Sequence, residues 1–480
     1  MDRNAGLGRA TAQCERNGHT WGANTRRGVR MSAALNANRL DELVSLERGE
    51  VDRRIFSDAE IFEQEMTLIF GRAWQFLCHE SQIPKAGDFF ETPMGRDNVL
   101  TVRQRDGSIR AMLNTCTHRG NAVCRAEEGN TKAFMCTYHG WSFDLAGKLI
   151  GVPDVEKFYK GDLDKSKYGL VHVAQLESYH GFVFATMDPA APALADYLGP
   201  AGRIAIDLIA AREVEIIPGV QKFTIDCNWK FAVDNVFDWY HAQVTHMSAV
   251  ASGLFPPAEG EVEVGGARNT LGESLDIPSG LMGNGVDDLV LVSEFGHAAA
   301  GPSVDGLGGM PIDTSWRKRP QAVEWLGEVG SKVCGYPNIF PNAWLATAGG
   351  QLALRVPVSP NRTEIWWFSF VEKNATPDQR KMTVMLAGHI FGPAGILEQD
   401  DGENWAQSTQ QTYGHRSRQV PQLLKMGLGR GKVVKENGLA RIEGSTSEHA
   451  QLWTYHAWAQ WMKGLDWDEL REATIPPDTL

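Results

Sequence analysis

Two short segments that pair a cysteine with a histidine constrain this 480-residue chain most strongly. Cys116-Thr117-His118 is followed, after seventeen residues, by Cys136-Thr137-Tyr138-His139. A Rieske [2Fe-2S] cluster needs two thiolates on one iron and two imidazoles on the other, and two mixed pairs supply this set. Structural zinc is the alternative, but zinc sites usually place both cysteines in one turn and both histidines in another. The spacing predicts these cluster ligands: Cys116, His118, Cys136 and His139.

The residues around these segments predict a small all-β domain. Turn signals at residues 85–87, 105–107 and 146–148 separate runs that are rich in strand-forming residues. We expect a Rieske domain over residues 70–190, with the metal-binding segments on its loops. The expected linker is Pro189-Ala190-Ala191-Pro192, because two prolines in four residues break regular structure.

A second set of candidate metal ligands lies in residues 229–246, a segment that predicts one helix. Two histidines and one carboxylate on one face of an iron ion leave open positions for dioxygen, as in non-haem Fe(II) oxygenases. His241 and His246 are five residues apart, which is a rotation of about 140° on a straight helix. Both reach one ion only if the helix bends or ends between them. Alone, such a pair is more often a coincidence than a metal site.

Three segments together resemble the large (alpha) subunit of Rieske non-haem iron aromatic-ring-hydroxylating dioxygenases, over about residues 55–462. They are the Cys/His pairs, the segment Asp234-Asn235…Asp238-Trp239-Tyr240-His241…His246, and Phe391-Gly392-Pro393-Ala394-Gly395…Glu398-Gln399-Asp400-Asp401. The resemblance implies that Asp401 completes the mononuclear iron site with His241 and His246. It implies that Asp400 is a solvated neighbour, and that Asp238 links His241 to a Rieske histidine of the adjacent subunit.

The same resemblance implies the fold, the assembly and the pocket. We expect an α+β chain in which a helix-grip catalytic domain, an antiparallel sheet with helices, covers residues 191–480. The expected assembly is a homotrimer, alone or as α3β3 with a small beta subunit. Candidate pocket residues are Asn235, Phe237, Phe391 and Leu397. For the last three, ordinary core packing explains the residue equally well.

The function implied is that of the terminal oxygenase of a multicomponent dioxygenase, with one [2Fe-2S] cluster and one Fe(II) per chain. It would add both atoms of O2 to an aromatic ring and give a cis-dihydrodiol. No Gly-Xaa-Gly-Xaa-Xaa-Gly opens a strand-helix unit, so electrons from NAD(P)H would arrive through an external reductase or ferredoxin. A Rieske monooxygenase or demethylase, and a pure electron-transfer protein, are the alternatives.

Two substrate classes stay open. Two residues separate Asn235 from Asp238, as in relatives that act on benzoate, anthranilate or salicylate, whereas residues 119–130 and 391–395 resemble the hydrocarbon branch. The substrate is therefore an aromatic acid of the benzoate or phthalate type, or a polycyclic aromatic hydrocarbon. Arg317, Lys318 and Arg319 are candidate partners for an acid, although charge runs are more often solvated turns.

Composition and the chain ends complete the expectations. A net charge of −12 argues against a nucleic-acid partner, and no apolar run reaches the ~18 residues of a membrane span. Seven cysteines, an odd number, favour a reducing cytoplasm over a disulfide framework. The composition of residues 1–35 predicts a disordered N-terminal extension. Met31 is an alternative translation start within it. Residues 36–69 predict helices that pack on the catalytic domain, one from Leu40 and one over Asp58 to Phe70 capped by Ser57.

Overall fold

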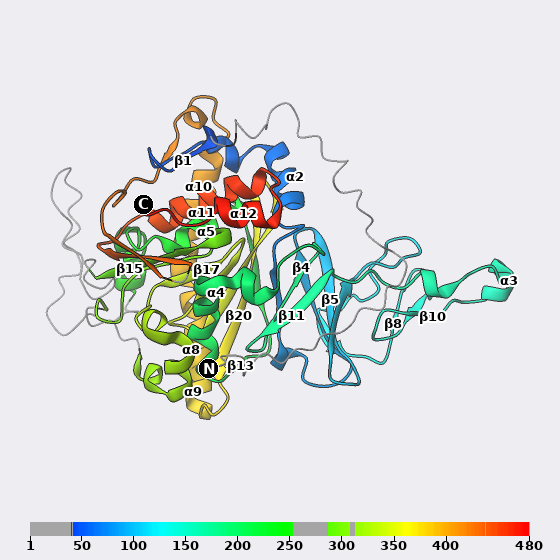
Figure 1. Cartoon of the computed structure of the whole chain (residues 1–480). Helices are drawn as coiled ribbons and strands as arrows, with labels where there is room; N and C mark the ends of the chain where they lie inside the picture. Colours follow the sequence, from blue (N-terminus) through cyan, green and yellow to red (C-terminus); the bar gives the residue numbers. More distant parts are fainter. Residues whose placement is uncertain (1–39, 41, 253–286, 308–312, 437, 480) are drawn as a thin grey trace. The chain divides into compact units, whose positions relative to one another are not determined.

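The computed structural model describes residue 40 and residues 42–252, 287–307, 313–436 and 438–479. The predicted extension, residues 1–35, lies outside these ranges. Two compact units divide the described chain, one of residues 70–194 and one of residues 38–69 and 195–480. The first consists mainly of strands, and the second combines a large antiparallel sheet with helices (Figure 1). The α+β prediction is confirmed.

The first unit contains three small antiparallel sheets. Its described strands are β3 (Gln75–His79), β4 (Asp88–Met94), β5 (Asp97–Arg103), β6 (Ile109–Leu113), β7 (Glu128–Asn130), β8 (Phe134–Met135), β9 (Ser142–Phe143), β10 (Leu149–Gly151), β11 (Gln175–Tyr179) and β12 (Phe182–Thr186). A short helix, α3 (Val155–Tyr159), lies at the tip of the excursion that follows β10 (Figure 1). Cys116 and Cys136 are buried in this unit's apolar core beside Phe134 and Trp141.

The second unit is built on one sheet with the strand order β13-β20-β19-β18-β17-β16-β15-β23-β22, and β14 also pairs with β20. Every described pair is antiparallel. The strands are β13 (Val214–Ile216), β14 (Gln221–Ile225), β15 (Asp288–Ser293), β16 (Ala298–Ala300), β17 (Tyr336–Ile339), β18 (Ala343–Ala346), β19 (Gln351–Ser359), β20 (Arg362–Glu372), β22 (Lys432–Glu436) and β23 (Leu439–Gly444).

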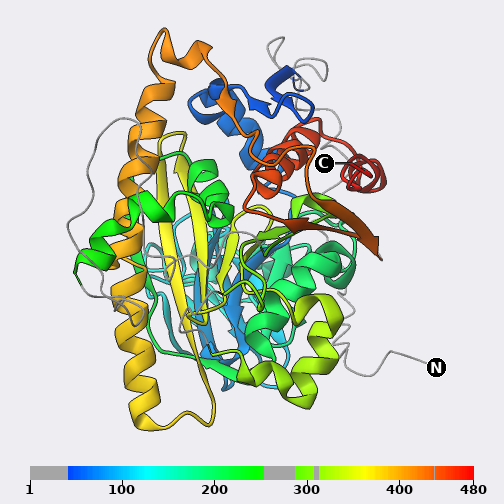
Figure 2. The same cartoon turned by 90° about the vertical axis from the view of Figure 1, so that its left-hand side faces the viewer.

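Strand alternation gives this sheet two apolar faces, each covered by helices. Leu289 and Leu291 pack with α4 (Leu194–Ala210) and α8 (Pro320–Gly330). Val290 and Val292 face the other way, toward α5 (Trp229–Asp234), α10 (Ile396–Thr412) and α11 (His449–Met462). Figure 2 shows α9 (Pro377–Ile390) and α10 following one another along the long strands β19 and β20. The unit also contains α6 (Ala242–Thr245), α7 (Met247–Ala251) and α12 (Trp467–Ala473).

The N-terminal segment of this unit differs from the prediction in two places. The helix expected from Leu40 stops before Val44, because β1 (Val44–Ser45) pairs with β2 (Glu50–Val51), which in turn pairs with β21 (Gln422–Leu423). The helix α2 (Ala59–Leu68) is capped by Asp58 rather than Ser57. The Asp58 carboxylate accepts from the amides of Glu60 and Ile61 at 2.8 and 3.3 Å, so it satisfies donors at the helix start.

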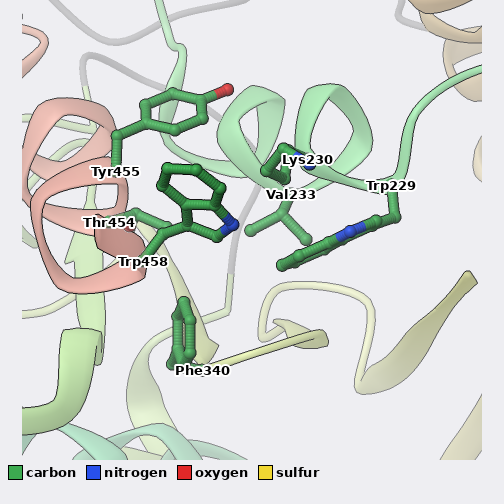
Figure 3. Close-up of a pocket in the computed structure, with 7 residues that line it drawn as sticks. All are labelled: Trp229, Lys230, Val233, Phe340, Thr454, Tyr455 and Trp458. Carbon is green, nitrogen blue, oxygen red and sulfur yellow. The ribbon is translucent and has the colours of Figure 1, made fainter. Parts of the chain in front are cut away.

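A buried carboxylate ties α2 to two helices of the same unit. Glu65 accepts from the Lys230 ammonium at 2.5 Å and from the indole N–H groups of Trp229 and Trp458 at 2.8 and 2.7 Å. Beside this group lies a cavity of about 10 Å³, which has room for at most one water molecule. Figure 3 shows its walls, which include none of the predicted metal ligands or pocket residues. Among the described residues, no helix is long and apolar enough to cross a bilayer.

Candidate metal centres

Cys116 and Cys136 open two turns with the same backbone hydrogen bonds. The amide of each cysteine donates to the carbonyl five residues further on, at 2.8 Å in both turns. Gly120 and Gly140 donate back to the cysteine carbonyls at 2.8 and 2.9 Å, with φ angles of +73° and +70° that only glycine adopts readily. The two segments therefore fold as equivalent knuckles, although the histidine comes second after one cysteine and third after the other.

Like side chains of the two knuckles meet in pairs. The thiols of Cys116 and Cys136 interact directly, and the rings of His118 and His139 lie 4.4 Å apart. These four donor groups do not form one of the described clusters that could hold a single metal ion. Tetrahedral zinc would bring all four together. Separate thiol and imidazole pairs fit the two irons of a Rieske cluster.

The protein surroundings favour the thiolate form at Cys136 but not at Cys116. Burial raises the pKa of Cys136, but backbone amides of its own turn and the side chain of Asn121 outweigh this effect and lower it. The Asn121 amide nitrogen lies 3.6 Å from the sulfur. Burial also raises the pKa of Cys116, and there it prevails. The His118 ring stacks on Trp141 at 4.8 Å and 7°, which fixes the imidazole plane.

The segment that carries His241 and His246 is not one helix, so the helix predicted over residues 229–246 is wrong. After α5 and a 3-10 turn (Asn235–Phe237), Asp238 adopts an extended conformation. Its carboxylate accepts from the amides of Tyr240 and His241 at 2.9 and 3.2 Å, in place of helical carbonyls. A new helix, α6, then runs between the two histidines. His241 and His246 therefore flank a single helical turn.

Asp401 of α10 meets both histidines. Its Oδ1 lies 3.1 Å from His241 Nε2 and 3.5 Å from His246 Nε2, and the two Nε2 atoms are 3.2 Å apart. Ligand atoms about 2.1 Å from one ion at roughly right angles would be about 3 Å apart. Among the described residues, these three side chains form the cluster that can hold a single metal ion. Their spacing fits three ligands on one face of an iron ion.

The electrostatics of this triad call for a cation. Burial lowers the pKa of His241, but the carboxylates of Asp238 and Asp401 outweigh burial and raise it to about 10. Burial lowers the pKa of His246, and there burial prevails. Asp401 Oδ1 is buried without a hydrogen-bond partner among the described residues. A bound metal ion would compensate this carboxylate charge.

Each histidine has a second carboxylate near its other ring nitrogen. His241 Nδ1 lies 3.5 Å from Asp238, and His246 Nδ1 lies 3.9 Å from Asp400. Carboxylates beyond metal-bound histidines commonly orient the rings in this way. Asp400, expected to be a solvated neighbour, is partly buried and accepts a hydrogen bond from Ser248. The carboxylate is therefore still partly solvated, and it also contacts α7 and lies near His246.

Three of the predicted pocket residues lie in one apolar cluster beneath the sheet. Phe237 and Phe391 are buried in this cluster, and Leu397 is partly buried and packs against it. Phe391 stacks on Trp367 with ring centroids 5.0 Å apart and planes at 12°. Asn235 begins the 3-10 turn after α5 and is half-buried. These contacts do not separate pocket walls from core packing, and the pocket assignments stay predictions.

The basic run at residues 317–319 is largely structural. Arg317 is buried rather than solvated, and its guanidinium donates to the Val333 carbonyl at 2.7 Å and to Cys334 Sγ at 3.4 Å. Arg319 pairs with Glu372 at 2.9 Å. Both guanidinium groups therefore have partners within the protein.

A buried ion pair behind the triad was missed in the sequence. Arg355 of β19 lies 3.4 Å from Glu398 of α10, and both side chains are 1% exposed. Glu398 is three residues before Asp401, a spacing that places both on one helix face. Nothing local in the sequence connects Arg355 with this helix.

Comparison with known families gives matches in both units. Residues 73–180 match the Rieske [2Fe-2S] domain, and residues 196–463 match the catalytic domain of the ring-hydroxylating alpha subunit. The chain belongs to the family of ring-hydroxylating dioxygenase alpha subunits. It is thus an oxidoreductase of this type and the terminal oxygenase component.

Several relatives are similar over most of their length. The chain is 36% identical to the biphenyl 2,3-dioxygenase alpha subunit of Rhodococcus jostii, over 91% of this chain and 93% of that one. It is 35% identical to the benzene 1,2-dioxygenase alpha subunit of Pseudomonas putida, over 92% and 98%. A naphthalene 1,2-dioxygenase structure with indole bound aligns with a TM-score of 0.78 and 31% identity, over 92% and 98%. A quaternary ammonium Rieske monooxygenase, at 18% identity and a TM-score of 0.59, shares the fold.

Proposed function

We propose that this alpha subunit adds both atoms of dioxygen to a ring of an aromatic hydrocarbon and yields a cis-dihydrodiol. The observation that carries the proposal is the convergence of His241, His246 and Asp401, in a chain whose other unit pairs two thiols and two imidazoles. The relatives named for biphenyl, benzene and naphthalene support a hydrocarbon substrate. The internal partners of Arg317 and Arg319 weaken the case for an aromatic acid.

The residues divide the work between two metal groups. When bound, the iron supplies the activation of dioxygen, and the [2Fe-2S] cluster supplies electrons. His241, His246 and Asp401 would hold Fe(II), while Asp238 and Asp400 orient the two imidazoles through their Nδ1 atoms. The cluster would be held by Cys116, His118, Cys136 and His139. Phe237, Phe391 and Leu397, with Asn235, would position an apolar ring and exclude water.

The electrons would originate from NAD(P)H and arrive through an external reductase, with or without a ferredoxin, in the cytoplasm. We propose a homotrimer, alone or with a small beta subunit, in which Asp238 links His241 to a Rieske histidine of the neighbouring subunit. The Asp238 side chain is 34% exposed, so one of its faces is open to a partner. A closed three-fold ring has heterologous interfaces and suits such head-to-tail contact.

Labelled dioxygen tests the reaction. The purified oxygenase, with a surrogate reductase and ferredoxin, would be offered biphenyl, benzene, naphthalene, benzoate and phthalate under ¹⁸O2. We expect a cis-dihydrodiol of a hydrocarbon with both oxygen atoms labelled. One labelled atom in the product would establish a monooxygenase, and turnover of the acids alone would establish the other substrate class.

The Asp238→Ala variant tests the electron route. It should retain both metal groups and the trimer, but turnover should fall by about 100-fold or more, because the orienting carboxylate of His241 is lost. The rate at which reduced cluster reoxidises with substrate and dioxygen measures the step. Asp226→Ala, which removes a mostly exposed aspartate of the same unit, is the control. Reoxidation of the Asp238 variant at the wild-type rate would contradict the route.

A further inference from the structure

Arg355 brings a full positive charge to the buried side of the proposed iron site. Its guanidinium is enclosed by three indole rings, with centroids at 4.6 Å for Trp344, 5.4 Å for Trp367 and 5.8 Å for Trp405. Among the described residues, the carboxylate of Glu398 lies within ion-pair distance of it, at 3.4 Å. Its Nη1 group has no hydrogen-bond partner among the described residues. A buried cation is strongly destabilising unless an opposite charge compensates it, so Arg355 needs the Glu398 carboxylate.

Glu398 is itself held firmly at the sheet. One of its oxygens, Oε2, accepts from the Trp367 indole at 2.5 Å and from the Gly392 amide at 2.7 Å. The other oxygen, Oε1, faces Arg355. These contacts fix the carboxylate between the start of α10 and strands β19 and β20. Glu398 is therefore not a metal ligand, because one carboxylate oxygen accepts hydrogen bonds and the other faces the Arg355 guanidinium.

The guanidinium faces the same side of α10 as Asp401. Glu398, Asp401 and Trp405 are three and four residues apart, so they project within about 60° of one another. Arg355 contacts the first and the third of these positions, and Asp401 lies between them along the helix. Burial lowers the pKa of Arg355, while the carboxylates of Glu398 and Asp401 act to raise it. Arg355 therefore interacts electrostatically with both carboxylates of this helix face, and more strongly with Glu398 than with Asp401.

We infer that Glu398 is a positioning residue for the iron site, because it neutralises Arg355 and so leaves the Asp401 carboxylate available to the metal. This inference rests on the proposed function, since it requires iron at His241, His246 and Asp401. Without Glu398, the uncompensated guanidinium would attract Asp401 and repel a divalent cation. Both effects weaken iron binding without removing any ligand.

Three variants test this role in the full chain with its cluster retained: Glu398→Gln, Arg355→Met, and the two changes combined. The mononuclear site would be emptied with a chelator and titrated anaerobically with Fe(II). We expect Glu398→Gln to weaken Fe(II) binding by about 10- to 100-fold. Arg355→Met should bind Fe(II) at least as well as wild type, and the double variant should recover most of the lost affinity. Thermal unfolding of each iron-free variant provides a reading independent of activity.

The pattern separates charge compensation from simple anchoring of α10. If Glu398 only anchored the helix, the double variant would bind Fe(II) as weakly as Glu398→Gln, and this result would overturn the inference. Unchanged Fe(II) binding in Glu398→Gln would also overturn the inference, as would a tenfold loss of Fe(II) affinity in Arg355→Met. If the Glu398→Gln variant does not fold, the result for Arg355→Met decides the case alone. An Asp401→Ala variant with the same iron content as the wild-type protein would overturn the proposed function as well.

Discussion

The two candidate metal sites reach their geometry by opposite routes. In the first unit, the four cluster ligands lie within 24 consecutive residues, 116–139, and each knuckle is closed by its own backbone hydrogen bonds. In the second unit, the histidines flank one short helix, and the carboxylate comes from a helix far along the chain. Local turns shape the first site, whereas tertiary packing shapes the second. A substitution at one site should therefore remove its own metal group and leave the metal group of the other site in place.

The largest expected effect is loss of the cluster in Cys116→Ser. No other residue at this spacing can replace the thiolate, so the reddish-brown colour and the reduced-state EPR signal should vanish. His139→Ala should give the same result. Cys124→Ser is the control, because the Cys124 thiol points to the Ala126 carbonyl at 3.4 Å and is outside the thiol pair. A retained cluster in Cys116→Ser would refute the assignment.

Asp401→Ala should produce the reverse loss. Two histidines alone bind Fe(II) weakly, so mononuclear iron and product should disappear while the Rieske spectrum is retained. Asp400→Ala, which removes only the carboxylate near His246 Nδ1, should reduce activity by about 10- to 100-fold at most. If the two aspartates behaved the other way round, Asp400 would be the ligand.

A weaker effect should follow from breaking the buried pair of Lys230 and Glu65. Lys230→Met leaves a carboxylate buried without its cation, which should lower the free energy of unfolding of the catalytic unit by about 3–5 kcal/mol. Urea unfolding followed by tryptophan fluorescence measures the change. Adding Glu65→Gln should recover much of the loss, and the cluster spectrum should be unaffected in either variant. No difference from wild type would show that the pair contributes little.

The smallest effect concerns Asp234, which accepts hydrogen bonds from Tyr455 at 2.6 Å and Gln422 at 3.2 Å. Burial raises the pKa of its carboxyl from 3.8 to about 7. The folded state therefore favours the neutral form, and the associated stability is complete below about pH 4 and is lost as pH rises to 7. Asp234→Asn cannot ionise, so its melting temperature relative to wild type should rise by about 2–4 °C between pH 5.5 and pH 8. A difference that does not change with pH would contradict this.

The contrast between the two sites also explains what the sequence could predict. The four cluster ligands could be predicted because their spacing along the chain brings them together in two short turns. The break before His241 was not, since the Asp238 side chain takes over amide donors that a helical pattern assigns to carbonyls. The ion pair of Arg355 and Glu398 joins a strand to a helix, and no local pattern reports such a contact. Asp401 was reached through family resemblance rather than periodicity.

Iron and inorganic sulfide content per chain tests the central claim most directly. A chain with one [2Fe-2S] cluster and one separate iron should contain about three iron atoms and about two sulfides. Asp401→Ala should contain about two irons with the sulfide unchanged, and Cys116→Ser about one iron with no sulfide. Wild-type protein with two irons, or iron lost together with sulfide in the Asp401 variant, would contradict two independently built metal centres.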